Sequence, residues 1–384
     1  MTRIAYVSTY VPQRCGLATY TYHVRKYVAA AKGEAEPDPV LVPVRPEHEP
    51  TGDPHLWPMR RDHIADYIAM AERLNQSDVD VVSLQHEFGI FGGEAGAHIL
   101  HFIRRLRKPL ITTFHTVFEK PVPPYASIQR EIAERSTELV VMNRKAADLL
   151  HRSFHISKAK IRYIPHGTPT PEGIDREEVR RKLGWTDRKV LMTFGLLSRG
   201  KGIESLLGVL PEVVQQVPNT LYAIVGQTHP EVWKWEGERY REELLDQIRK
   251  LGLGQHVVMI DRYMEEDDLV RHLTACDLYV TPYPGLQQIT SGTLAYAVGL
   301  GRPVVTTPYV YAVDLLEGCD ELFIHPDRKA EWAGTIAALL KNDRLLDEWS
   351  RKIYAIGKTM HWAEVGKRYL EVFNEVGSLA HTQV

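Results

Sequence analysis

Residues 165–173 read Pro-His-Gly-Thr-Pro-Thr-Pro-Glu-Gly, and this stretch divides the 384-residue chain into two halves of similar pattern. Three prolines and two glycines within nine residues can continue neither a strand nor a helix, so the stretch is typical of a linker. On each side of it, short apolar runs alternate with longer segments of helical periodicity. This alternation is typical of strands joined by crossover helices into a parallel sheet. The sequence therefore predicts an α/β protein with two Rossmann-like, doubly wound domains.

The apolar runs predict six strands in each half. In the first half they are Ile4–Ser8, Val40–Val44, Val79–Leu84, Leu110–Phe114, Leu139–Met142 and Ile161–Ile164. In the second half they are Val190–Phe194, Leu221–Val225, Val257–Ile260, Leu278–Thr281, Val304–Thr306 and Leu322–Ile324. Helical patterns between them include Leu17–Ala31, Ala95–Leu106, Ile203–Val217 and Tyr240–Leu251. The ligand is expected where the carboxyl ends of both sets of strands face one cleft.

The domain boundaries follow from these patterns. We expect an N-terminal domain over residues 1–168, a linker over 169–186 and a C-terminal domain over 187–356. The last sixty residues are helical in pattern, and we expect a helix near Trp362–Val376, within residues 357–384, to return to the first domain.

Composition excludes several other classes of protein. The chain has 47 basic and 49 acidic residues, so it offers no strongly basic field for a nucleic acid. Residues 1–170 carry a net +4 and the rest −6, which leaves peripheral contact with an anionic membrane surface open. Three widely spaced cysteines predict neither a disulfide scaffold nor a thiolate zinc site, and they suit a reducing, cytoplasmic location. No signal peptide or run of about 18 apolar residues is visible.

Two loops of the second half are predicted to bind phosphate. Residues 195–202, Gly-Leu-Leu-Ser-Arg-Gly-Lys-Gly, combine exposed backbone amides and two cations immediately before a helix. Residues 290–293, Thr-Ser-Gly-Thr, lie at the start of a second helix, where amides and hydroxyls can bind the same anion. The loop lacks the ending of a Walker A motif, which disfavours nucleoside triphosphate hydrolysis. The predicted phosphate-binding residues here are Gly195, Arg199, Lys201, Thr290, Ser291, Gly292 and Thr293.

Three loops of the first half follow predicted strands. Gly16 opens a helix and exposes amides to an anion. The stretch after the third strand holds His86 and Glu87 before a glycine-rich loop that can wrap a sugar, and it lacks the second histidine of a zinc motif. His115 comes directly after the apolar end of a strand, where a side chain points toward the ligand. No set of metal ligands is visible, so we expect no metal and no resident cofactor.

These motifs together resemble those of the family-4 retaining glycosyltransferases. The resemblance rests on the loop at Gly16, His115, residues 165–167, the cationic loop at 198–202 and the strand entry Gly301-Arg302-Pro303-Val304-Val305. It covers nearly the whole chain, including Trp362 and the final helix. It implies the GT-B fold, in which two Rossmann-like domains face a cleft and the second domain holds most of the nucleotide sugar.

The chain departs from the family pattern at several positions. Leu196 stands where the family has an arginine, so Arg199 is expected to replace it, and Cys15 stands where a first glycine is usual. Gln288 and Tyr296 align with two family glutamates, of which the first usually contacts the donor sugar and the second the ribose. Either nucleotide recognition differs here or the donor is not an ordinary nucleotide sugar.

The resemblance implies transfer of a hexosyl group from a nucleoside-diphosphate sugar to a carbohydrate or lipid-linked acceptor, with retention of configuration and without a metal. The catalytic residues it implies are His115, Arg199, Lys201 and Gln288, with Tyr296 at the ribose and Gly16, His86 and Glu87 at the acceptor. Two alternatives stay open: a retaining sugar phosphorylase of the same fold, and a non-catalytic sugar- or nucleotide-binding module.

Overall fold

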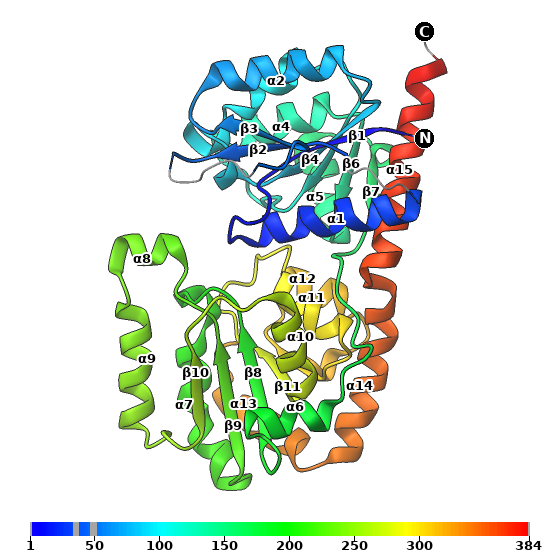
Figure 1. Cartoon of the computed structure of the whole chain (residues 1–384). Helices are drawn as coiled ribbons and strands as arrows, with labels where there is room; N and C mark the ends of the chain where they lie inside the picture. Colours follow the sequence, from blue (N-terminus) through cyan, green and yellow to red (C-terminus); the bar gives the residue numbers. More distant parts are fainter. Residues whose placement is uncertain (1, 34–37, 47–51, 383–384) are drawn as a thin grey trace. The chain divides into compact units, whose positions relative to one another are not determined.

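The computed structural model describes residues 2–33, 38–46 and 52–382. The chain forms two compact units (Figure 1): Met1–Gly167 with Trp362–Val384, and Thr168–His361. Residues 169–186, predicted to be a linker, belong to the second unit and contain helix α6 (Arg176–Leu183). Arg176 and Arg180 of α6 bind Asp277, which precedes a strand of that unit. These ion pairs attach the segment to the second unit, so it packs as part of that unit and does not act as a linker.

The first unit is built on a seven-stranded parallel sheet of order β3-β2-β1-β4-β5-β6-β7. Its strands are β1 (Ile4–Val7), β2 (Val40–Val44), β3 (Leu56–Arg60), β4 (Val81–His86), β5 (Leu110–Phe114), β6 (Glu138–Val141) and β7 (Ile161–Tyr163). The sequence analysis missed the edge strand β3. Only Met59 of that strand is fully buried and Pro58 interrupts it, so the strand has no apolar run to reveal it.

Helices cover both faces of this first sheet. They are α1 (Gly16–Lys32), α2 (Ile64–Gln76), α3 (Ile99–Arg105), α4 (Tyr125–Arg135), α5 (Arg144–Phe154) and α15 (Trp362–Thr382), with short 3-10 turns η1 (Phe88–Ile90), η2 (Glu94–Gly96) and η3 (Lys158–Lys160). Helices α1 and α15 pack together over one face, where Tyr20 and Tyr369 join a core with Tyr6 of β1. The C-terminal helix is therefore part of the core of the first unit.

The second unit is built on a five-stranded parallel sheet of order β10-β9-β8-β11-β12. Its strands are β8 (Lys189–Phe194), β9 (Thr220–Val225), β10 (Val257–Ile260), β11 (Leu278–Thr281) and β12 (Val304–Thr306). The sixth strand predicted at Leu322–Ile324 is wrong. Asp320–Leu322 form a 3-10 turn, η5, and Phe323 makes only an isolated bridge to Thr306, because the helical turn uses the first residue of an already short apolar run.

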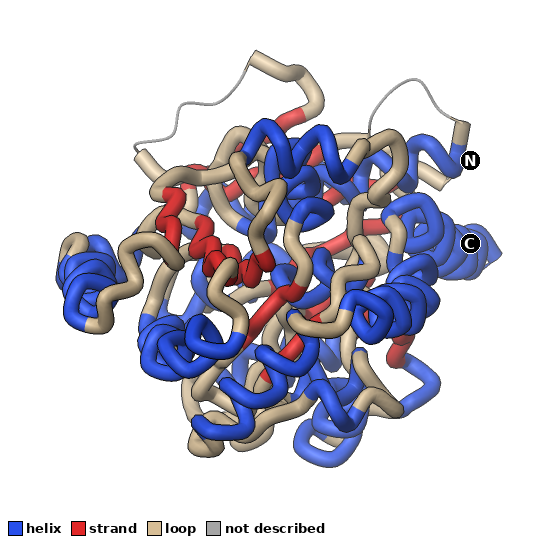
Figure 2. The backbone as a smooth tube through the Cα atoms, turned by 90° about the horizontal axis from the view of Figure 1, so that it is seen from below, coloured by secondary structure: helices blue, strands red, loops and turns tan. Residues whose placement is uncertain are grey.

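Helices again lie on both sides of the strands (Figure 2). They are α6, α7 (Ile203–Gln216), α8 (Pro230–Glu236), α9 (Arg239–Lys250), α10 (Glu266–Ala275), α11 (Gly292–Gly299), α12 (Val310–Leu315), α13 (Lys329–Leu340) and α14 (Asp343–Gly357), with 3-10 turns η4 (Arg199–Lys201) and η6 (Lys358–Met360). One core lies under α7, α9 and α13, and the other under α10 and α11. Across the described ranges, no helix combines the length and the apolar character needed to cross a membrane.

Candidate functional site

The loop after β8 and the start of α11 meet at the carboxyl edge of the second sheet. Gly195 has φ +129°, a conformation that residues with side chains rarely adopt. A Cβ atom at this position would lie 3.2 Å from Thr293 Cγ2 and 3.3 Å from Lys201 Nζ. The structure therefore brings together three residues that the sequence analysis predicted to bind phosphate.

Lys201 supplies the positive charge of this cluster. Its Nζ donates to Tyr283 Oη at 2.9 Å and lies 4.6 Å from the centre of that ring. Tyr283 Oη lies 2.8 Å from Thr293 Oγ1. Within the described ranges, Lys201 forms no ion pair with a carboxylate. Its charge is therefore balanced only by a hydroxyl and an aromatic ring, an arrangement that favours an incoming anion.

Sequence reasoning missed Tyr283, although its position could have identified it. It lies two residues after the end of β11, at the carboxyl edge where ligands of such sheets bind. Its side chain is fully buried and its ring stacks on Tyr309 at 5.2 Å. The buried, stacked ring of Tyr283 therefore fixes the hydroxyl to which Lys201 donates.

The start of α11 contributes hydroxyls and backbone amides to the same edge. Ser291 caps the helix, and its Oγ accepts a hydrogen bond from Leu294 N at 3.3 Å. Ser291 Oγ also lies 3.2 Å from Thr293 Oγ1. The predicted donor-sugar residue Gln288 is exposed, and its amide donates to the carbonyl of Thr290 at 2.7 Å. The side chain of Gln288 is thus tied to its own loop rather than to the Lys201 cluster.

Arg199 does not join Lys201, contrary to the expectation that both cations hold one diphosphate. Its guanidinium donates to Glu243 at 2.7 Å and to Glu236 at 3.1 Å, and it lies 5.0 Å from the ring centre of Tyr240. The hydrogen bonds to Glu243 and Glu236 raise the pKa of Arg199. The physical reason is that α8 and α9 present carboxylates to this side of the loop and neutralise the guanidinium there.

The segment from β9 into α8 adds a residue that the sequence analysis overlooked. Leu197 forms an isolated bridge with Thr228, and His229 N donates to Leu197 O at 2.9 Å. These contacts bind the loop before Lys201 to the loop after β9. Burial lowers the pKa of His229, and this effect outweighs the charge of Glu231, which raises the pKa; the charge of Lys201 lowers it. His229 is therefore a neutral neighbour of the Lys201 cluster at neutral pH.

Tyr296 of α11 reaches a carboxylate on another helix. Its hydroxyl donates to Glu266 Oε2 at 2.7 Å, and its ring lies near that of Phe194. Glu266 begins α10 and is partly exposed at the same edge of the sheet. The position where a family glutamate was expected thus holds a tyrosine whose hydroxyl contacts a glutamate from α10. No local sequence signal links these two residues.

In the first unit, His115 lies directly after β5. Burial lowers the pKa of His115 to about 3, so the imidazole is neutral at physiological pH. Its Nε2 lies 2.9 Å from Gln85 Oε1, and Tyr20 packs edge-on against the ring with centroids 4.8 Å apart. A neutral, held imidazole at the end of a strand can exchange hydrogen bonds with a substrate hydroxyl.

His86, predicted to contact the acceptor, instead lies in the core of the first unit. The sequence analysis ended the strand at Leu84, whereas β4 continues through His86. The imidazole is therefore turned into the core, fully buried between the rings of Phe88, Phe91 and Phe114. Neither ring nitrogen has a partner among the described residues, and burial lowers the pKa of His86 to about 3. In this structure His86 is therefore a core residue.

The two other predicted acceptor residues lie at helix starts. Glu87 accepts hydrogen bonds from Phe88 N at 2.9 Å and from Thr116 Oγ1 at 2.6 Å, and burial raises its pKa. Gly16 is exposed as the first residue of α1, where a Cβ atom would meet nothing within 4 Å. Cys15 caps that helix through a bond from Ala18 N to its Sγ. Gly16 therefore leaves access to the first amides of α1.

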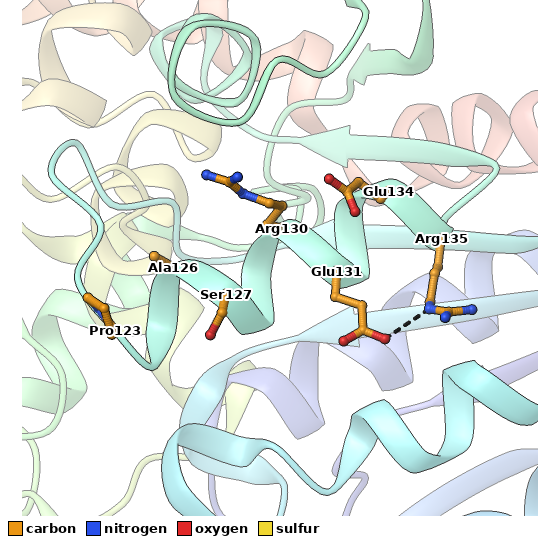
Figure 3. Close-up of a pocket in the computed structure, with 7 residues that line it drawn as sticks. All are labelled: Pro123, Ala126, Ser127, Arg130, Glu131, Glu134 and Arg135. Atoms are coloured by element: carbon orange, nitrogen blue, oxygen red, sulfur yellow. Dashed lines mark hydrogen bonds and ion pairs between the residues drawn. The ribbon is translucent and has the colours of Figure 1, made fainter.

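Two cavities lie away from these residues. One, of about 580 Å³, runs along α4 and the turn before it (Figure 3). Its walls are Pro123, Ala126, Ser127, Arg130, Glu131, Glu134 and Arg135. The other, of about 640 Å³, lies at the amino ends of the second sheet's strands, where Asp277 ties Arg176 and Arg180. In the part of the chain that the structure describes, no three His, Cys, Asp or Glu side chains converge as metal ligands would.

Two parallel α/β units, one with a seven-stranded and one with a five-stranded sheet, define the GT-B class of fold. Two family models match the sequence: Glycosyltransferase Family 4 over residues 16–171 and Glycosyl transferases group 1 over residues 188–342. The chain belongs to the family-4 glycosyltransferases of the GT-B fold.

Solved structures share this fold at low sequence identity. The Anabaena protein HepE in complex with UDP and glucose is similar with a TM-score of 0.76 and 15% identity, covering 97% of this chain and 100% of that one. Sucrose-phosphate synthase from Thermosynechococcus elongatus is similar with a TM-score of 0.77 and 16% identity, covering 99% and 100%.

Curated relatives match only part of the chain. Spore coat protein SA of Bacillus subtilis is 25% identical over 207 residues, which is 52% of each chain. The GDP-mannose-dependent alpha-(1-6)-phosphatidylinositol monomannoside mannosyltransferase of Mycolicibacterium smegmatis is 27% identical over 172 residues, which is 44% of this chain and 42% of that protein. The chain thus spans about half the length of these relatives.

Proposed function

We propose that this chain transfers a hexosyl group from a nucleoside-diphosphate sugar to an acceptor hydroxyl, with retention of configuration and without a metal. The observation that carries the proposal is the ammonium of Lys201, which has no carboxylate partner among the described residues and lies beside Gly195 and the start of α11. Membership of the family supports the reaction class. Structures of similar fold were solved with UDP or UDP-glucose, which supports a nucleotide-sugar donor.

In this proposal Lys201 and the start of α11 stabilise the departing diphosphate. Negative charge grows on the leaving oxygen as the glycosidic bond breaks, and preorganised donors at such a position are worth about 10²–10³ in rate each. Thr293 and the first amides of α11 add neutral donors beside the cation. The leaving phosphate then takes the proton of the acceptor hydroxyl on the same face of the sugar.

The predicted second cation, Arg199, takes a smaller part in this proposal. To reach a diphosphate it would have to exchange two carboxylate hydrogen bonds for phosphate ones. We therefore assign most of the charge stabilisation to Lys201. Comparing alanine variants at the two positions separates their contributions.

We propose that Glu266 receives the ribose hydroxyls, in place of the role first given to Tyr296. The Tyr296 hydroxyl already donates to Glu266 and orients the carboxylate. A carboxylate can accept from two vicinal hydroxyls, whereas a single phenol offers one group. The contact thus supplies from α10 the negative charge that α11 lacks.

His115 is proposed to hold a hydroxyl of the donor sugar, since its neutral ring lies at the end of β5. The acceptor is proposed to be a carbohydrate or a lipid-linked sugar near Gly16 and Glu87. Two relatives are named as a phosphatidylinositol monomannoside mannosyltransferase and a glycolipid mannosyltransferase, and these names support an acceptor of this kind.

A binding screen followed by a transfer assay tests the proposal. Nucleoside diphosphates and their sugars are added to the full chain, and a binder present at 100 times its dissociation constant raises stability by about 2.7 kcal/mol. The stabilising donor is then incubated with acceptor sugars, and NMR of the product gives its anomeric configuration. Release of a sugar 1-phosphate with inorganic phosphate would instead support a phosphorylase, and binding without turnover of any acceptor would support a binding module.

A further inference from the structure

A row of polar side chains crosses one buried face of the first sheet. Strands buried on both faces of a parallel sheet are normally apolar throughout. Here Ser83 and Gln85 of β4 share a face with Thr113 of β5, because Gln85 is paired in register with Thr113. His115 follows two residues later on that same face. Ser83, Gln85 and Thr113 are fully buried, so their hydrogen bonds must be satisfied within the protein.

The amide of Gln85 is the centre of this row. Its Nε2 donates to Ser83 Oγ and to Thr113 Oγ1, each at 3.4 Å. Thr113 Oγ1 lies 3.1 Å from Tyr369 Oη, which lies 2.9 Å from Tyr20 Oη. The amide nitrogen therefore donates to hydroxyls of β4 and β5. From Thr113 of β5 the chain of polar contacts continues to Tyr369 of α15 and Tyr20 of α1.

The remaining atom of the Gln85 amide faces His115. The carbonyl oxygen, Oε1, lies 2.9 Å from His115 Nε2. A carbonyl oxygen can only accept a hydrogen bond, so His115 Nε2 must carry the proton. Since burial keeps the pKa of His115 low, the ring holds one proton at neutral pH. His115 Nδ1 is then left as a hydrogen-bond acceptor.

We propose that Gln85 is a positioning residue that fixes the tautomer of His115, so that His115 Nδ1 accepts a hydrogen bond from a hydroxyl of the sugar substrate. The proposal rests on the proposed function, because it concerns the histidine assigned there to the donor sugar. It also explains why buried polar side chains replace apolar packing beneath α1 and α15. In this proposal the row of hydrogen bonds ends at His115, the side chain of the row that contacts the substrate.

The first test uses the unliganded wild-type protein. Histidine is labelled with ¹⁵N, and long-range ¹H–¹⁵N correlation spectra identify which ring nitrogen of His115 is protonated. The signals are assigned by their loss in His115→Asn. We expect protonated Nε2 and unprotonated Nδ1 at pH 7. Protonated Nδ1 as the main form would overturn the proposal, whatever the enzyme assay shows.

The second test removes the carbonyl while keeping the shape of the side chain. In Gln85→Met the tautomer preference of His115 should be lost, and kcat should fall about 10–100-fold, by analogy with groups that orient metal-bound histidines. The Michaelis constant for the donor should stay within about threefold, because phosphate binding lies in the other unit. Ser83→Ala, which touches Gln85 but not His115, is the matched control and should keep the tautomer and most of the activity.

A third variant keeps an acceptor but adds charge. In Gln85→Glu a carboxylate next to the ring should preserve protonated Nε2 and raise the pKa of His115 by roughly one to three pH units. An unchanged tautomer in Gln85→Met, or an unchanged titration of His115 in Gln85→Glu, would overturn the proposal. Full glycosyl transfer by His115→Ala would also overturn it, because the ring would then hold no substrate hydroxyl. By contrast, the proposed function fails separately if the wild-type protein shows the expected tautomer but transfers no hexosyl group from any nucleotide sugar.

Discussion

The imidazole of His86 should make the protein sensitive to acid. Burial lowers its pKa to about 3, against about 6.5 in an unfolded chain, and no described residue offers it a hydrogen bond. Below about pH 6.5 the unfolded state therefore takes up a proton that the folded state refuses. The stability contributed by the neutral ring is complete at higher pH and is lost as the pH falls toward 3.

The expected loss follows from this difference in pKa. Protonation of His86 in the unfolded state alone lowers the free energy of unfolding by about 1.36 kcal/mol for each pH unit below 6.5. Over the two units from pH 6.5 to pH 4.5 the loss is about 2.7 kcal/mol. His86→Leu removes the titrating group and leaves an apolar side chain of similar size among three phenylalanines. The free energy of unfolding of this variant should therefore fall about 2.7 kcal/mol less than that of the wild type between pH 7 and pH 4.5.

Urea unfolding at the two pH values, followed by circular dichroism and tryptophan fluorescence, measures this difference. His63→Leu is the matched control, since it removes an exposed imidazole before α2 and should leave the pH dependence as in the wild type. If His86→Leu lost as much stability as the wild type between pH 7 and pH 4.5, the ring would not be neutral and enclosed, and the assignment of His86 to the core would be refuted.

Three further predictions concern the proposed reaction. Lys201→Ala should lower kcat at least about 100-fold, whereas Arg199→Ala, which loses a guanidinium already held by two carboxylates, should cost less than about tenfold; equal losses would place both cations on the diphosphate. Glu266→Gln should raise the Michaelis constant for the donor about tenfold or more, and Tyr296→Phe only a few-fold, because a charged hydrogen bond is worth about 1.5–3 kcal/mol and a neutral one about 0.5–1.5. Abolished turnover with unchanged donor binding in Tyr296→Phe would instead put that hydroxyl on the reacting sugar. Transfer rates should be the same with and without EDTA, and loss of activity restored by manganese would refute the metal-independent reaction.

Several parts of the site could be predicted from sequence because they depend on neighbours along the chain. Apolar periodicity located eleven of the twelve strands that the structure describes. In the second unit, two of those strands are followed by loops that contain glycines and lead into a helix. Ligands of such sheets bind at the carboxyl ends of the strands, and this rule predicted that Gly195, Lys201 and Thr293 lie close together in neighbouring loops. The same rule put His115 at the end of β5. Apolar periodicity and the direction of each strand are local properties of the chain, so a single sequence is enough to predict them.

Other assignments failed because a small local shift reversed a side chain. Extending β4 by two residues moved His86 from a loop into the core, since successive side chains of a strand alternate between its faces. The edge strand β3 escaped notice because it packs too few apolar residues to form a pattern. Where a strand ends, and whether an edge strand forms, depends on the backbone groups of the adjacent strand that are available for hydrogen bonding. The adjacent strand comes from a distant part of the sequence.

The electrostatic partners were decided by the tertiary structure alone. Arg199 is bound by carboxylates 37 and 44 residues away, Tyr296 by one 30 residues away, and Thr113 contacts Tyr369 across 256 residues. Each partner sits on a different helix whose packing angle sets which hydroxyl or carboxylate arrives at the site. A sequence specifies which groups can donate or accept a hydrogen bond, but the pairing depends on distances of about 3 Å that only the packed helices and sheets determine.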